Sequence, residues 1–159
     1  MIILEGADAS GKTTLIYQLA AEFNLPIVKS YKPRTPDDIR LFHHWAAAAP
    51  RTPLLDRHAA ISDLVYGPII RKTTPSTVAL AQHYLVDNFL VFCCPPYSTV
   101  EKTLHNEQQM DGVADNSLAL YKGYEQLMEQ LEPQFIYDWT NPRAFRSLCT
   151  HIQHYLTRS

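Results

Sequence analysis

The residues best placed to do chemistry lie near the start of the sequence, where a glycine-containing loop follows the apolar run 2–4. Residues 6–14 read GADASGKTT and match the pattern G-x-x-x-x-G-K-[ST]. In such a loop the glycines free the backbone to wrap a polyphosphate, and successive amide N–H groups point at its negative charge. Lys12 is then expected to reach the β- and γ-phosphates, and the Thr13 hydroxyl to join the shell of a Mg²⁺ ion. Together these features predict a nucleotide-binding phosphate loop.

A carboxylate and a guanidinium form a second candidate site where another predicted strand ends, at Asp56 and Arg57. In a parallel sheet this end lies at the ligand-binding edge, beside the phosphate loop, where Asp56 can hold Mg²⁺ directly or through water. Arg57 can grip a phosphate through two parallel hydrogen bonds. The structural alternative is that the pair caps the next helix. We expect the metal ligands to be Thr13 and Asp56.

The elements that must position these residues are short strands alternating with amphipathic helices. Strands are predicted at 2–4, 27–30, 52–56, 89–94 and 135–137, and helices at 12–23, 37–49, 61–70, 76–86, from about 98, 118–131 and 141–156. Such alternation implies right-handed βαβ units and a parallel sheet covered on both faces. With the phosphate loop it predicts an α/β P-loop NTPase fold with three αβα layers and a five-stranded parallel sheet in the order 2-3-1-4-5. A single domain over residues 1–159 is expected.

Composition narrows the class of protein. The chain has 159 residues, of which 46% are hydrophobic, and this fits one globular domain with a substantial core. Its formal net charge of −2 provides no global positive field, so a nucleic-acid partner is not expected. No apolar run approaches the roughly 20 residues that span a bilayer, and a strand that begins at Ile2 leaves no room for a signal peptide before the fold. A cytoplasmic protein is expected.

Two motifs resemble those of thymidylate kinases. Residues 4–14, LEGADASGKTT, resemble the EGxDxxGKTT loop of that family, and Asp56-Arg57-His58 with Ser62 and Tyr66 resembles its DR(Y/H/F)…S…AY segment. The resemblance covers most of the chain in element order. It implies Mg²⁺-dependent phosphoryl transfer from ATP to a deoxynucleoside monophosphate, such as dTMP or a related pyrimidine deoxynucleotide. The compact chain is similar to the thymidylate-kinase-like enzymes of bacteriophages, which would act in the host cytoplasm.

The resemblance also implies roles for individual residues. Arg57 would hold the acceptor phosphate, Asp8 would lie near the acceptor sugar, and Arg34 is similar to the acceptor-phosphate arginine that follows the second strand. With Lys12, Asp8 and Arg57 form the predicted catalytic set. The residues expected to bind ATP are Ala9, Ser10, Gly11, Lys12, Thr13, Thr14 and Arg143. Those expected to bind the acceptor are Asp8, Arg34, Phe42, Arg57, Ser62, Tyr66 and Gln109.

Aromatic side chains of this set have an alternative role. Phe42, Trp45 and Tyr66 could stack on the acceptor base, but aromatic residues at helical spacing more often form the core. Arg143 follows the last strand, where related kinases hold adenine, and the alternative is an ordinary surface arginine.

The polar segment 106–116 is the predicted lid, and it departs from the family because it contains no arginine or lysine. The phosphate loop likewise has Ala9 where some thymidylate kinases carry a catalytic arginine. The charge on the transferring phosphoryl group would then be met by Lys12, by Mg²⁺, and by a cation from elsewhere such as Arg71 or Lys72, or by the lid glutamines.

Other functions are compatible with the same motifs. The acceptor could be a deoxynucleoside or a modified base in DNA, although the acidic charge balance disfavours a long phosphate track. The chain could also be a regulatory module that binds ATP without transferring phosphate. A GTPase is disfavoured because the sequence has no NKxD-like segment. A homodimer is compatible with the sequence.

Overall fold

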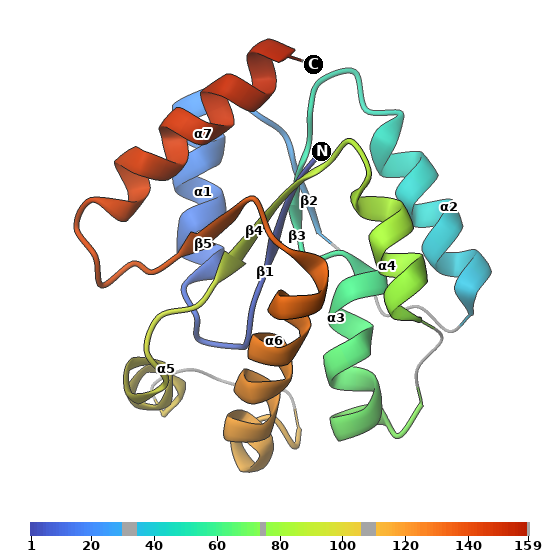
Figure 1. Ribbon diagram of the computed structural model, residues 1–159, viewed down its shortest axis with the longest axis vertical. Helices are drawn as coiled ribbons and strands as arrows, with labels where there is room; N and C mark the ends of the chain where they lie inside the picture. The colour runs from blue at the N-terminus through green and yellow to red at the C-terminus, as the bar shows by residue number, and fades with distance from the viewer. Residues whose placement is uncertain (30–34, 74–75, 106–110, 159) are drawn as a thin grey trace.

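The fold is built on one parallel sheet. The computed structural model describes residues 1–29, 35–73, 76–105 and 111–158 (Figure 1). Five strands form the sheet in the order β2-β3-β1-β4-β5, and every neighbouring pair is parallel. The predicted strand order is therefore confirmed. The strands are β1 (Ile2–Glu5), β2 (Ile27–Lys29), β3 (Leu54–Asp56), β4 (Phe89–Cys93) and β5 (Phe135–Tyr137).

Helices connect consecutive strands, as the alternation predicts. The α-helices are α1 (Lys12–Phe23), α2 (Pro36–Ala47), α3 (Ala59–Tyr66), α4 (Val78–Leu85), α5 (Tyr97–Leu104), α6 (Ser117–Leu131) and α7 (Ala144–Arg158). Two short segments have other geometries: the π-helical η1 (Gly67–Arg71) and the 3₁₀-helical η2 (Ala114–Asn116).

The two faces of the sheet carry separate cores, because successive side chains of a strand point to opposite sides. Ile2 and Leu4 of β1 pack with α1 and α7, whereas Ile3 packs with α2, α3, α4 and α6. Figure 1 shows α1 and α7 on one side of the sheet and α2, α3, α4 and α6 on the opposite side. All three of these β1 side chains have no exposed surface. This arrangement is the predicted three-layer architecture.

Two predicted helices differ from the observed ones at their ends. The helix expected over 61–70 ends as an α-helix at Tyr66 and continues as the π-helical η1. The last helix, which Asn141 and Pro142 are expected to cap, begins only at Ala144. Asn141 forms a turn before it, since its side-chain oxygen accepts a hydrogen bond from the Arg143 N–H at 3.0 Å. Short Asn turns of this kind compete with helix formation.

Local sequence signals explain the start of α2. The Thr35 hydroxyl accepts a hydrogen bond from the Asp38 N–H at 3.2 Å, and the Asp38 carboxylate accepts one from the Thr35 N–H at 2.9 Å. This reciprocal pair is a capping box, and Pro36 occupies the first helical position, where its missing N–H costs nothing.

Among the helices of the described residues, none combines the length and hydropathy needed to cross a membrane.

Candidate active site

The phosphate loop has a wrapped backbone that requires glycine at two positions. Gly6 has φ +140°, and a β-carbon there would collide with the Cys93 carbonyl oxygen of β4. Gly11 has φ +89° and forms the N-terminal cap of α1. Both values lie in the region that side chains rarely adopt. Thr13 and Thr14 lie exposed in the first turn of α1.

The lysine of the loop is buried and folded back on the loop backbone. Lys12 is 6% exposed, and its Nζ donates to the Ala7 carbonyl at 2.5 Å and to the Ser10 hydroxyl at 3.4 Å. Burial, and to a smaller extent the nearby charge of Arg57, lower the pKa of Lys12 to about 8. A bound polyphosphate would place negative charge beside this ammonium group and so stabilise its charged form.

Asp8 and Arg57, which are far apart in the sequence, form an ion pair. The Arg57 Nη2 atom lies 2.5 Å from Asp8 Oδ1, and the Tyr66 hydroxyl donates to Asp8 Oδ2 at 2.6 Å. The Arg57 guanidinium also lies over the Tyr66 ring, 4.9 Å from its centroid, which is a favourable cation–π distance. The structure thus brings together three of the residues predicted from the two motifs.

The backbone turn at Arg57 directs this side chain. Arg57 has φ +70°, and its N–H donates to the Leu4 carbonyl of β1 at 3.0 Å. The residue that follows β3 therefore turns away from the sheet but keeps one backbone hydrogen bond to β1. The next residue caps α3, because His58 Nδ1 accepts a hydrogen bond from the Ala60 N–H at 3.2 Å. The alternative that Asp56 and Arg57 cap this helix is therefore wrong, since the cap is His58.

A buried layer beneath the ion pair was not predicted. Glu5 has no exposed surface; its Oε1 accepts from the His58 N–H at 2.6 Å and its Oε2 accepts from the Tyr124 hydroxyl at 3.1 Å. Tyr124, from α6, also accepts a hydrogen bond from Arg57 Nη1 at 3.2 Å. Burial raises the pKa of Glu5 to about 7, although the charge of Arg57 opposes this shift. Glu5 belongs to the recognised motif, whereas nothing in the pattern of α6 distinguishes Tyr124 from a core aromatic.

A cavity of about 220 Å³ opens beside the ion pair. It is lined by Asp8, Arg57, Ser62, Tyr66 and Arg71. The first four are predicted acceptor-binding residues, and Arg71 was considered only as a source of positive charge. The cavity therefore combines two guanidinium groups, one carboxylate, two hydroxyls and an aromatic ring.

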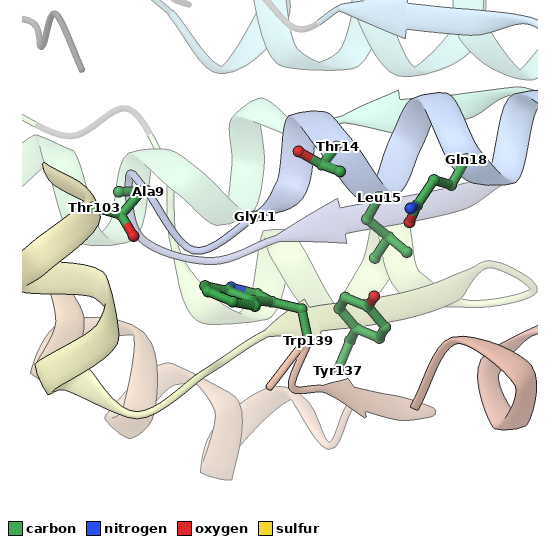
Figure 2. A pocket seen from close by; sticks show the side chains of 8 residues that line it. All are labelled: Ala9, Gly11, Thr14, Leu15, Gln18, Thr103, Tyr137 and Trp139. Atoms are coloured by element: carbon green, nitrogen blue, oxygen red, sulfur yellow. The ribbon is translucent and has the colours of Figure 1, made fainter. Parts of the chain in front are cut away.

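A second cavity, of about 440 Å³, lies on the other side of the phosphate loop (Figure 2). In Figure 2 the indole of Trp139, from the end of β5, lies next to the loop at Gly11, while Leu15 and Gln18 of α1 face Tyr137. The lining residues are Ala9, Gly11, Thr14, Leu15, Gln18, Thr103, Tyr137 and Trp139. Of these, Ala9, Gly11 and Thr14 were predicted to bind ATP.

The sequence motifs do not identify Trp139 and Tyr137 as site residues. Their position at the end of a strand does indicate the ligand-binding edge of a parallel sheet. Arg143, the predicted adenine-side arginine, is exposed four residues further on and is not one of the residues that line this cavity.

Other predicted residues lie elsewhere or outside the description. Phe42 is 5% exposed and lies in the core, with the rings of Trp45 and His58 each 6.1 Å away. This placement favours its alternative role as a core aromatic. Arg34 and Gln109 lie outside the described residues.

The described part of the predicted lid is anchored to the body. Val113 is 1% exposed and belongs to the core, and Gly112 has φ +82°. The Asn116 side chain donates to the Gly112 carbonyl at 2.8 Å. A β-carbon at Gly112 would lie 3.6 Å from the side chain of Ile70, so this segment runs beside η1. Residues 106–110 of the predicted lid lie outside the described residues.

The predicted metal ligands offer hard oxygen donors. Asp56 ends β3 in register with Leu4 of β1, directly before the phosphate loop, and Thr13 presents an exposed hydroxyl. Within the described ranges, no group of three or more His, Cys, Asp or Glu side chains could hold a metal ion. One carboxylate and one hydroxyl nevertheless suit Mg²⁺, which keeps several waters and takes its other ligands from substrate phosphates.

Solved structures share this fold at low sequence identity. The YorR protein from Bacillus subtilis, in complex with phosphorylated GDP, aligns with a TM-score of 0.77 at 18% identity and covers 96% of this chain and 95% of that chain. Deoxyadenosine kinase from M. mycoides with bound dATP aligns with a TM-score of 0.66 at 11% identity, covering 96% and 98%. Shikimate kinase from Bacteroides thetaiotaomicron gives 0.56 at 15% identity, covering 98% and 97%.

The sequence itself matches no protein-family model and no curated protein. The structural likeness confirms the predicted fold class, and the chain has the fold of P-loop kinases. The finer resemblance to thymidylate kinases and to phage enzymes stays a prediction.

Proposed function

We propose that this protein is a Mg²⁺-dependent kinase that transfers the γ-phosphoryl group of ATP to a deoxynucleoside monophosphate, with dTMP or a related pyrimidine deoxynucleotide as the first candidate. The observation that supports this most directly is that the phosphate loop separates two cavities. Asp8 lines one of them, and the next residue, Ala9, lines the other. A donor in the larger cavity and an acceptor in the smaller one would meet at the loop, beside Lys12.

On the donor side, the loop amides and Lys12 would hold the phosphates of ATP, and Trp139 would supply an aromatic face for the base. The Lys12 ammonium would move from the Ala7 carbonyl, its partner at 2.5 Å, to the phosphate oxygens. Thr13 and Asp56 would hold Mg²⁺, which when bound neutralises phosphate charge and orients the β- and γ-phosphates. Phosphoryl transfer depends chiefly on such positioning and charge stabilisation.

On the acceptor side, Arg57 would bind the acceptor phosphate and Asp8 would accept a hydrogen bond from the sugar. Arg57 is suited to this because Asp8, Tyr66 and Tyr124 hold its guanidinium in a fixed orientation. A preorganised guanidinium loses little entropy when it binds a phosphate.

A panel of acceptors tests the proposal. The protein is incubated with γ-labelled ATP and Mg²⁺ and with each of the deoxynucleoside monophosphates, the deoxynucleosides, or single- and double-stranded DNA. We expect label in a deoxynucleoside diphosphate. Transfer to none of these acceptors, with ATP still bound, would leave the non-catalytic ATP-binding module as the better assignment.

The second candidate is a deoxynucleoside kinase. It is favoured by the fold shared with deoxyadenosine kinase, at a TM-score of 0.66. In that case the same panel yields a labelled monophosphate from a nucleoside, and Asp8 would hydrogen-bond the attacking hydroxyl. A modified base in DNA is the remaining acceptor considered, and label in DNA would identify it.

A further inference from the structure

Arg71 is held at the edge of the smaller cavity by a buried acid. Its Nη1 atom lies 2.6 Å from Asp63 Oδ1, and the two side chains are 17% and 1% exposed. A buried carboxylate needs a partner, since an unpaired charge is costly to remove from water. Arg71 is therefore fixed rather than free to extend into solvent.

The π-helical turn is what brings this pair together. A regular α-helix advances about 100° per residue, so a side chain eight positions after Asp63 would point about 80° away from it. The hydrogen bonds of a π-helix span five residues, so each residue of η1 advances by less and Arg71 returns to the face of Asp63. Such segments are uncommon and occur frequently at functional sites.

Two arginines lie near one aromatic ring in this cavity. The guanidinium carbon of Arg57 lies 4.9 Å from the centroid of the Tyr66 ring, and that of Arg71 lies 6.0 Å from it. Among the described residues, each arginine pairs with one carboxylate, through one nitrogen atom. A guanidinium has five N–H donors, so both retain donors for a further anion.

One donor of Arg71 has no protein partner. Its Nε is buried, and it makes no hydrogen bond within the part of the chain that the structure describes. An unsatisfied buried donor is destabilising, and an anionic oxygen in the cavity would remove that penalty. The donor-side cavity has a different lining that does not include Arg71, so the anion would belong to the acceptor.

We propose that Arg71 is a second ligand of the acceptor's phosphate group, acting together with Arg57 in the same cavity, and that Asp63 positions it. This inference rests on the proposed function, because it requires an acceptor that already carries a phosphate. It assigns to η1 a positive charge that the predicted lid lacks.

Paired ligands that differ by one phosphate test this inference. Binding of dTMP and of thymidine is measured by titration calorimetry for the wild type and for Arg71→Gln, Arg71→Lys and Arg40→Gln. Arg40 is the matched control because it also contacts an aspartate through one nitrogen, Asp37 at 3.4 Å, but is exposed on α2. The KM for ATP and for the acceptor, and kcat, are measured in parallel.

For Arg71→Gln we expect about 10- to 100-fold weaker dTMP binding, as for loss of a charge-assisted hydrogen bond. Thymidine binding and the KM for ATP should change by less than about twofold, within the context dependence of such contacts. Arg71→Lys should give an intermediate loss, because it keeps the charge but not the planar donor fork. Arg40→Gln should behave as the wild type.

The failures are distinguishable. If the wild type phosphorylates a monophosphate but Arg71→Gln binds dTMP as Arg40→Gln does, the role of Arg71 is wrong and the proposed function stands. A fall in kcat with unchanged acceptor binding would move Arg71 to the transferring phosphoryl group and also overturn the inference. If the wild type binds thymidine as tightly as dTMP and phosphorylates no monophosphate, the proposed function itself is wrong. Should Arg71→Gln not fold, the Asp63→Asn/Arg71→Gln double variant removes both charges and is measured instead.

Discussion

Trp139 lies directly against Gly11: a β-carbon at Gly11 would be 2.7 Å from the Cδ1 atom of the indole. The contact joins the end of β5 to Gly11, the N-terminal cap of α1. It leaves no room for any side chain at the α1 cap, and it places a large aromatic surface at the mouth of the larger cavity. The larger cavity, which we propose as the donor site, therefore depends on two segments that are 128 positions apart in the sequence.

We predict that Trp139→Ala raises the KM for ATP about 10-fold, because base stacking on an aromatic side chain contributes about 1–3 kcal/mol. Trp139→Phe should retain most of the affinity, and the acceptor KM should not change. Trp45→Ala is the control, since that indole is 64% exposed on α2. An unchanged KM for ATP in Trp139→Ala would show that the base does not bind in this cavity.

We predict that Lys12→Ala lowers kcat at least about 100-fold, because no other described cation lies within the phosphate loop to follow the γ-phosphate. The far-UV circular dichroism spectrum should be unchanged. Retention of more than about a tenth of the wild-type kcat, a barrier change below about 1.4 kcal/mol, would contradict the assignment of the loop.

The pKa of Lys12 leads to a pH dependence. Burial lowers this pKa to about 8, so the free protein loses the ammonium charge as the pH rises through that value. Since kcat/KM reports ionisation of the free enzyme, we expect kcat/KM for ATP to fall above about pH 8. Bound phosphate restores the charge, so kcat should persist to higher pH. A flat kcat/KM profile up to pH 10 would mean that a charged Lys12 is not required.

His58 should make the fold sensitive to acid. Burial, and to a smaller extent His43, lower the pKa of His58 from 6.5 to about 3, so the unfolded chain binds this proton more readily than the folded one. Stability is then lost as the pH falls below about 6.5, by about 2 kcal/mol between pH 7 and pH 5. Urea unfolding at both pH values measures it.

His58→Asn should remove most of this loss, because asparagine can also cap α3 but does not titrate. His44→Asn, at an exposed position on the preceding helix, should keep the wild-type pH dependence. An equal pH dependence for His58→Asn and the wild type would show that another group causes it.

Tyr124→Phe tests the buried layer under Arg57. Loss of the hydroxyl removes hydrogen bonds of 3.1 Å to Glu5 and 3.2 Å to Arg57, so we expect the acceptor KM to rise roughly 10-fold and the KM for ATP to stay unchanged. Tyr121→Phe is matched: it lies on the same helix and donates to the Pro95 carbonyl at 2.9 Å, away from the cavity. It should lose comparable stability without a change in acceptor KM.

Much of the fold and the central pairing of the site follow from local sequence signals. The phosphate loop, the strand order and the meeting of Asp8 with Arg57 could be predicted because each depends on a contiguous motif at the end of a strand. Tyr124 and Trp139 could not be assigned in the same way, since their roles arise from contacts across more than 60 positions.

The pairing of Arg71 with Asp63 could not be predicted from the sequence, for a different reason. Helical periodicity assumes a constant rotation per residue, and the π-helical η1 breaks that assumption. Phe42 illustrates a second difficulty, because this aromatic residue could stack on a ligand or join the core, and it lies in the core. Periodicity identifies a buried face but does not say whether protein or ligand covers it.

Of the described residues that line the smaller cavity, all but one come from a single stretch of the chain, 57–71, and none of the described residues that line the larger cavity belongs to that stretch. The two halves of the site are therefore separable modules. The selectivity of the smaller cavity for its ligand could be changed by grafting or randomising residues 57–71, while the residues that line the larger cavity stay the same. The same separation would let natural variants diversify one preference without disturbing the second.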